Sequence, residues 1–214
     1  MRTLGKLALI VVVPVALAGV GLVHPHLLTP ATADRWAILH IVLLPVFPLL
    51  ALGLIVPLWG RPRRDAAGVA TVVAWVCLFV YATFYTGLDT IAGVAAGTVA
   101  RNADGADVGR SVQALFDTGD RLGYVGAYGF GAAVLAASVA LFPRHGIRVV
   151  PGAVVLLAAS YSFVDSHIFW PRGVFTMLAF AAGFALLAGA ADDQLRPRRM
   201  RQMANPASSP PSSR

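Results

Sequence analysis

The stretch AAGVATVVAWVCLFVYATFYTGL, residues 66–88, contains no charged side chain and is long enough to cross a bilayer as a helix. About 20 apolar residues at a rise of ~1.5 Å span a hydrocarbon core of ~30 Å. Because lipid offers no partner to unpaired backbone groups, such a segment must form its hydrogen bonds internally, and helix is the expected state. The fold follows from the repetition of segments of this kind along the chain.

Six apolar segments are separated by mostly short connections. They cover about residues 7–23, 36–59, 66–95, 122–142, 149–170 and 174–191. Of the 214 residues 57% are hydrophobic and 13% are charged, whereas soluble domains contain roughly a quarter charged residues. The sequence therefore predicts an all-α fold, a six-span transmembrane helix bundle over residues 1–191, followed by a basic, disordered cytoplasmic tail over residues 192–214.

The basic residues indicate the orientation of the spans. With the N-terminus inside, the cytoplasmic segments carry 12 of the 17 Lys and Arg residues, and the opposite side carries 5. An excess of Lys and Arg in short loops marks the cytoplasmic side. We therefore expect a multipass protein of the plasma membrane with both termini in the cytoplasm. Its partner is the lipid bilayer, with anionic lipid a candidate at the basic tail; nucleic acid is not expected.

The first segment allows a second interpretation. Arg2 and Lys6 precede an apolar run that reaches Ala16-Leu17-Ala18, a small-x-small pattern typical of signal-peptide cleavage. The apolar run continues through Val23, which favours a retained helix. If residues 1–18 are cleaved, five spans remain and the C-terminus is still inside.

Proline and glycine suggest how the helices pack. Pro45 and Pro48 lie a third of the way through the second span, so we expect a kink near residues 44–47, because proline lacks an amide donor and clashes with the preceding turn. A broken helix can expose carbonyls to a ligand, and it also occurs in membrane proteins with no such use. Small residues at four-residue spacing over 123–131 favour close helix packing within the chain, with dimerisation as the alternative.

Ionisable side chains gather at the outer ends of the spans. Four of the five histidines map there, together with two aspartates. Ionisable residues in membrane segments are costly and usually face the bundle interior, so this set is a candidate site. The candidates for ligand binding or proton relay are His24 and His26 after the first span, His40 in the second, Asp89 in the third, and Asp165 and His167 in the fifth.

Three interpretations of this set remain open. The leading one is an outward-facing His/Asp pocket that binds a small ligand or supports proton-coupled transport, since histidine titrates near neutrality. The second is a metal- or haem-binding membrane enzyme or redox protein, because imidazole and carboxylate suit Zn or Cu and two histidines at matched depth could hold a haem iron. The third is a structural or partner subunit without a site of its own. The candidate metal ligands are His24, His26, His40 and His167.

No familiar catalytic motif accompanies these residues, so an enzyme is not the leading expectation. Cys77 is the only cysteine, which excludes an intramolecular disulfide and a Cys-based zinc site. Ser160, Ser162 and Ser166 lie near the fifth-span candidates, but no G-x-S-x-G turn marks a serine nucleophile. The sequence supplies no substrate.

Two stretches in the first half of the chain resemble segments of uncharacterised multipass membrane proteins of GC-rich Gram-positive bacteria. They are ADRWAILH at residues 33–40 and FYTGLDTIAG at residues 84–93. Those proteins also tend to begin with a span that ends in His-Pro, as this chain does at residues 24–25. The resemblance implies a plasma-membrane location and favours His24, His40 and Asp89 as the residues to test.

Overall fold

The computed structural model describes residues 3–60 and 62–192, and every regular element within them is a helix. The predicted all-α fold is therefore present, whereas the predicted tail lies outside the described residues beyond residue 192. The elements, with η for 3₁₀ or π segments, are α1 (Thr3–Gly21), α2 (Ala33–Leu43), η1 (Phe47–Ala51), α3 (Leu52–Ile55), α4 (Ala66–Leu88), η2 (Asp89–Ala95), α5 (Ala96–Arg101), α6 (Gly109–His145), η3 (Gly146–Arg148), α7 (Val149–Ser166) and α8 (Arg172–Asp192).

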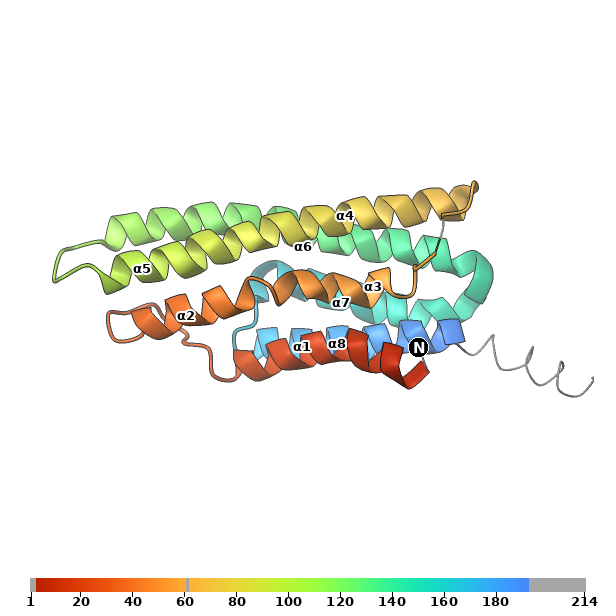
Figure 1. The fold of residues 1–214 in the computed structure, drawn as a ribbon, viewed down its shortest axis with the longest axis horizontal. Helices are drawn as coiled ribbons and strands as arrows, with labels where there is room; N and C mark the ends of the chain where they lie inside the picture. The colour runs from red at the N-terminus through yellow and green to blue at the C-terminus, as the bar shows by residue number, and fades with distance from the viewer. Residues whose placement is uncertain (1–2, 61, 193–214) are drawn as a thin grey trace, which may run out of the picture.

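The helices form a bundle whose members run along one long axis (Figure 1). α4, η2 and α5 make one continuous rod with α6 packed beside it, and the chain reverses through η3 into α7. At ~1.5 Å per residue, the 37 residues of α6 span about 55 Å and the 18 residues of α7 about 27 Å. At the end of the bundle opposite the start of α1, α2, α5 and α6 extend beyond α1 and α7 (Figure 1). The shorter helices thus leave a step at this end.

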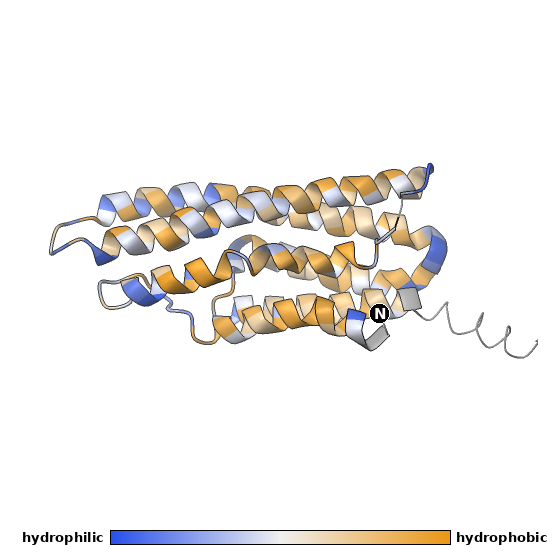
Figure 2. Ribbon diagram, viewed as in Figure 1, coloured by the Kyte–Doolittle hydropathy of each residue, from blue (hydrophilic) through white to orange (hydrophobic). Residues whose placement is uncertain are grey.

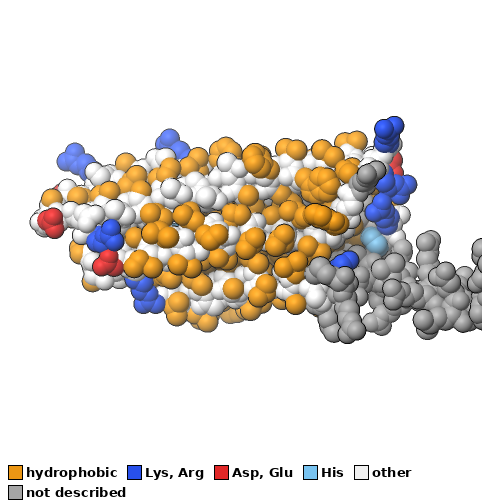
Figure 3. All heavy atoms as spheres, viewed as in Figure 1, with side chains coloured by type: hydrophobic (Ala, Val, Ile, Leu, Met, Phe, Trp, Pro, Cys, Tyr) orange, Lys and Arg blue, Asp and Glu red, His pale blue; other side chains and the backbone are white. Residues whose placement is uncertain are grey.

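Several helices have the properties of membrane spans. Three helical stretches are long and apolar enough to cross a membrane, and a fourth arises if the bent pair Ala33–Leu43 and Phe47–Ile55 counts as one span. The three stretches are Ala66–Arg101, Gly109–Ser166 and Arg172–Ala190. Apolar residues dominate the middle of the bundle (Figure 2), and hydrophobic side chains cover its surface there while Lys and Arg lie toward the ends (Figure 3). Such a surface is suited to an apolar surrounding.

The kink predicted in the second span is present. α2 ends at Leu43, and the axis of the following η1–α3 stretch is bent by 41° from it. Pro45 and Pro48 lie at the break, where they remove backbone donors. Tyr81 of α4 donates its hydroxyl hydrogen to the carbonyl oxygen of Phe47 at 2.8 Å. This hydrogen bond satisfies a buried backbone acceptor at the break and ties η1 to α4.

The helix that contains the fourth predicted span, residues 122–142, is longer than that apolar segment. α6 begins at Gly109, and its first turns carry charged and exposed residues such as Arg110 and Asp117. Hydropathy marks only the apolar part of a helix, so it cannot show that the helix continues as a polar rod. These polar first turns of α6 lie on one side of the step (Figure 1).

Small residues on α6 allow α4 and η2 to approach closely. A Cβ built on Gly119 would lie 2.6 Å from the Cβ of Ala92, and one on Gly126 would lie 3.0 Å from the backbone nitrogen of Tyr85. Carbon atoms in favourable contact are about 3.5–4.0 Å apart, so larger side chains would force the helices apart. The glycines of α6 therefore pack within the chain and bring this helix beside Asp89.

Candidate metal centre

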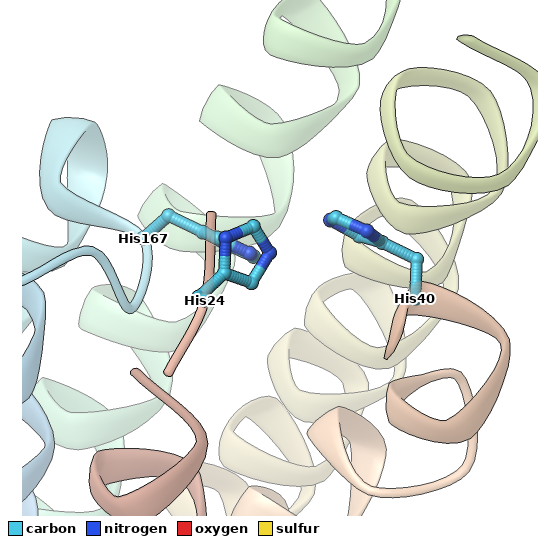
Figure 4. Close-up of side chains that lie close together, drawn as sticks. All are labelled: His24, His40 and His167. Atoms are coloured by element: carbon cyan, nitrogen blue, oxygen red, sulfur yellow. The ribbon is translucent and has the colours of Figure 1, made fainter. Parts of the chain in front are cut away.

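Three histidines from separate parts of the chain meet at the step. His24 follows α1, His40 lies on α2, and His167 follows α7 (Figure 4). One ring nitrogen from each lies within 4.8 Å of the other two. The ring centroids of His24 and His40 are 5.0 Å apart, and the His167 centroid is 6.1 Å from each. The tertiary fold, rather than local sequence, assembles this cluster.

Backbone carbonyls orient two of the rings. His24 donates from Nδ1 to the carbonyl of Pro25 at 2.8 Å, and His40 donates from Nδ1 to the carbonyl of Trp36 at 2.7 Å. Because a carbonyl only accepts, each ring carries a proton on Nδ1 and can present the lone pair of Nε2. Burial lowers the pKa of His24, in the α1–α2 connection, to about 4, so this ring is neutral at pH 7. Partners of this kind orient metal-ligating histidines in proteins.

His167 is held by a side chain and by an unusual backbone conformation. The Tyr85 hydroxyl lies 2.7 Å from His167 Nδ1. His167 has φ 43°, in the left-handed region that residues with a Cβ seldom adopt. Conformations of this kind concentrate at functional sites. Here the chain turns sharply at the end of α7, and the ring lies toward the other two histidines (Figure 4).

Asp89 adds a carboxylate to the cluster. It is 1% exposed, and its Oδ1 lies 3.9 Å from His167 Nε2. Among the described residues, neither carboxylate oxygen has a hydrogen-bond partner, and Nε2 of His24 and Nε2 of His167 also have none. Buried polar atoms in proteins are nearly always hydrogen-bonded, so four such atoms in one place require an explanation. A bound ion with its water provides one.

The π-helical geometry of η2 and a glycine bring Asp89 and His40 together. Single π turns inside α-helices are frequent at functional sites, and Asp89 is the first residue of this one. A Cβ built on Gly93 would overlap the His40 ring and lie 2.6 Å from the His40 Cβ. Trp36 donates from Nε1 to the Ala92 carbonyl at 3.1 Å. Gly93 therefore permits the close approach of α2 and η2, and Trp36 fixes it.

Aromatic side chains enclose the cluster. The His24 ring lies 4.8 Å from Phe169 and 5.0 Å from Trp36, and the His167 ring lies 5.0 Å from Phe47, measured between centroids. These rings are packed at van der Waals distances and restrict the imidazole rotamers. An apolar shell also lowers the local dielectric constant, which strengthens electrostatic interactions at the centre.

A cavity of about 290 Å³ adjoins the cluster. Its walls come from α2, the end of α4, η2, α6 and the end of α7, and they include His40, Asp89 and His167. A larger cavity of about 770 Å³ lies near Trp59 and Trp75, and its described lining contains no ionisable side chain. The smaller cavity is therefore the one that can bring a molecule to the histidines.

The structure brings together four of the six residues that the sequence singled out: His24, His40, Asp89 and His167. His26 is exposed although it lies two residues after His24. Asp165 lies on the wall of the smaller cavity, but its side chain is 56% exposed and its carboxylate pairs with Arg172 at 2.7 Å. Neither His26 nor Asp165 belongs to the cluster.

Three residues that support the cluster were not identified from the sequence: Trp36, Tyr85 and Gly93. The spacing of residues in the sequence nevertheless indicates two of them, Tyr85 and Gly93. Tyr85, Asp89 and Gly93 recur every four residues and so lie on one face of a helix. Asp89 thus lies between Tyr85, which bonds to His167 and is one turn before it, and Gly93, which admits the His40 ring and is one turn after it.

Known proteins give no guide to this arrangement. No family model matches the sequence, and no curated protein or solved structure is significantly similar to it.

Proposed function

We propose that this chain is a six-span membrane protein that binds one divalent transition-metal ion, best zinc, through His24, His40 and His167. The observation that carries the proposal is the convergence of three imidazoles from three segments. Two of them have a proton fixed on Nδ1 by a backbone carbonyl, and the third has Nδ1 at a tyrosine hydroxyl. Carboxylate, carbonyl and similar partners behind ligating histidines are typical of metal sites.

The geometry favours a metal over the small-ligand or proton-relay pocket that leads the sequence-based interpretations. A proton relay needs hydrogen-bond donors and acceptors that are joined in a continuous chain. In the described residues no hydrogen bond joins the three rings, and His24 stands edge-on to both His40 and His167. Their nitrogens converge on one region instead of forming a line.

The donor set favours zinc. Imidazole nitrogens suit Zn, Cu, Ni and Fe, and the absence of sulfur from the described cluster disfavours Cu(I). Tetrahedral zinc at ~2.0–2.1 Å from each nitrogen requires nitrogens about 3.4 Å apart. The nitrogens here lie within 4.8 Å of one another. Metal binding therefore draws the rings together by about an ångström, which small side-chain rotations can supply.

Haem fits this geometry less well. The rings of His40 and His167 are nearly parallel, with an interplanar angle of 6° and centroids 6.1 Å apart. A haem held between them would need a flat slot for the macrocycle. The ring of His24, 5.0 Å from His40 and 6.1 Å from His167, lies where that slot would be.

Asp89 balances the charge of the ion. Three neutral imidazoles leave the two positive charges of the metal uncompensated, which is costly in an apolar shell. Asp89 is the one buried acid among the described residues, and it lies beside the ligand set without belonging to it. A nearby carboxylate stabilises the bound ion electrostatically.

The membrane topology of the proposal follows the helices. The six spans are α1, the bent α2–η1–α3 stretch, the α4–η2–α5 rod, α6, α7 and α8. Support comes from the apolar surface of the bundle (Figure 3) and from the sequence, in which 12 of the 17 Lys and Arg residues fall in the segments assigned to the cytoplasm. In this arrangement the termini are cytoplasmic, the membrane is the plasma membrane, and the metal centre lies near its outer face.

Elemental analysis of the purified full chain, expressed with added zinc, tests the proposal. We expect about one zinc per chain in the wild type and less than a tenth of that in His40→Ala. His26→Ala is the matched control, because this exposed histidine lies next to the cluster and should keep its zinc. Wild-type protein without metal, or equal loss in the control, would contradict the proposal. A ligand-stabilised but metal-free wild type would favour the small-ligand pocket.

A further inference from the structure

The cavity beside the three histidines suggests a reaction. We infer that the metal centre hydrolyses an uncharged carboxylic ester, and that Asp89 accepts the proton of the attacking water. The inference rests on the proposed function, because it needs the bound ion. It adds a substrate class and a role for Asp89.

The ligand set leaves one coordination position open. Structural zinc sites are closed by four protein ligands, whereas catalytic sites have three and keep a position for water or substrate. The described cluster supplies three imidazoles. Two of them, His40 and His167, line the cavity of about 290 Å³. The fourth position can therefore open to that cavity.

Asp89 is placed to act on a water in that position. Asp89 Oδ1 is 3.9 Å from Nε2 of His167, one of the three proposed metal ligands. Within the described chain neither carboxylate oxygen of Asp89 has a hydrogen-bond partner. Two other acids line the cavity, but Asp120 is exposed and Asp165 is paired with Arg172. A general base must lie within hydrogen-bond reach of the proton that it takes. Among the acids of the described lining, only Asp89 is next to the metal ligands.

The lining of the cavity restricts the substrate. It contains three acids and no Lys or Arg among the described residues, which disfavours phosphates and carboxylates. The rest of the wall is mostly apolar and includes Leu88, Phe116, Phe163 and Val164. A volume of about 290 Å³ is at the lower end of the range for small-molecule pockets. A short, neutral acyl group fits these conditions.

The reaction is a hydrolysis without redox change. A zinc ion with an open position provides a nucleophilic water at neutral pH and polarises the ester carbonyl. Asp89 takes one proton from the water as its oxygen bonds to the acyl carbon. The bond between the acyl carbon and the alkoxy oxygen then breaks, and Asp89 returns the proton to the departing oxygen. One ester and one water give one carboxylic acid and one alcohol.

The ester could come from water or from the bilayer, because the cavity lies near the ends of α1 and α7. The experiment therefore uses two probes with the same short acyl group on the zinc-loaded full chain in nanodiscs: p-nitrophenyl butyrate in solution and hexadecyl butyrate in the bilayer. We expect cleavage of at least one probe, lost with a chelator and restored by zinc. Removal of the Asp89 charge should weaken zinc binding, so the variant is assayed with saturating zinc, where Asp89→Asn should still lower kcat by about 10²–10⁴-fold. The control Asp117→Asn, on the exposed part of α6, should keep full activity.

The outcomes separate the two proposals. Zinc bound without cleavage of either ester overturns the inference and leaves the metal site intact. Wild-type kcat in zinc-saturated Asp89→Asn overturns the role of Asp89 as base. Wild-type protein without zinc overturns both. A second measurement needs no variant: acetohydroxamate, which occupies an open metal position, should inhibit competitively, and lack of competition overturns the open site.

Discussion

Gly93→Ala tests whether the backbone distance between η2 and α2 controls the metal centre. The added Cβ would overlap the His40 ring and lie 2.6 Å from the His40 Cβ. Because the contact includes the Cβ, rotation of the ring alone cannot relieve it. A contact of about 3.5 Å between the new Cβ and the His40 Cβ requires α2 to move away from η2 by about 1 Å. This displacement adds to the movement of about an ångström that the rings already need to reach a zinc ion, and metal–ligand distances tolerate only about 0.2 Å, so His40 should bind poorly or not at all.

The expected effect is a loss of zinc affinity of at least 10–100-fold, as found when supporting contacts of metal ligands are lost, which corresponds to about 1.4–2.7 kcal/mol. Competition with a chromophoric chelator on detergent-purified protein measures it. Gly19→Ala is the matched control, since it makes the same change in a helix with no atom within 4 Å of the new Cβ. An unchanged zinc affinity in Gly93→Ala would refute the reasoning, provided the protein unfolds at the wild-type temperature.

Three further predictions concern hydrogen bonds and topology. Tyr85→Phe removes the hydroxyl at His167 Nδ1 and should weaken zinc binding about 10–100-fold in the same chelator competition; wild-type affinity would contradict this role. Tyr81→Phe leaves the Phe47 carbonyl without its donor and should cost about 1–3 kcal/mol of stability in thermal unfolding, with zinc affinity unchanged; an unaltered unfolding temperature would speak against it. In a Cys77→Ser background, Asp104→Cys should react with an impermeant maleimide added outside intact cells, and reaction only after permeabilisation would reverse the orientation.

Much of the architecture could be predicted because hydropathy and proline act locally. The all-α fold and the kink after Leu43 follow from the length of the apolar runs and from Pro45 and Pro48. The start of α6 at Gly109 could not be predicted from hydropathy, because a helix can pass from polar to apolar residues without any change in its backbone. The π turn at Asp89 has no reliable sequence signal either, since it depends on how η2 packs against α2 and α6.

The candidate site was predictable only as a set of residues at similar depth. The positions of His24, His40, Asp89 and His167 along the predicted spans place them at the same end of the bundle. The same argument places Asp165 there equally well. Whether a side chain points inward depends on the rotation of its helix and on the local backbone. Asp165 is exposed and pairs with Arg172. His167, two residues later, has φ 43° where the chain turns at the end of α7, and its ring lies toward the cluster (Figure 4). Such differences arise from tertiary packing.

Zinc K-edge X-ray absorption on the purified full chain tests the central claim most directly, because it reports the atoms around the ion. The metal centre predicts about three nitrogen donors at ~2.0–2.1 Å, with the outer-shell scattering of imidazole. That scattering should decrease in His24→Ala and in His167→Asn. A shell of oxygen atoms alone, or a spectrum identical in wild type and both variants, would contradict a site built from these three histidines.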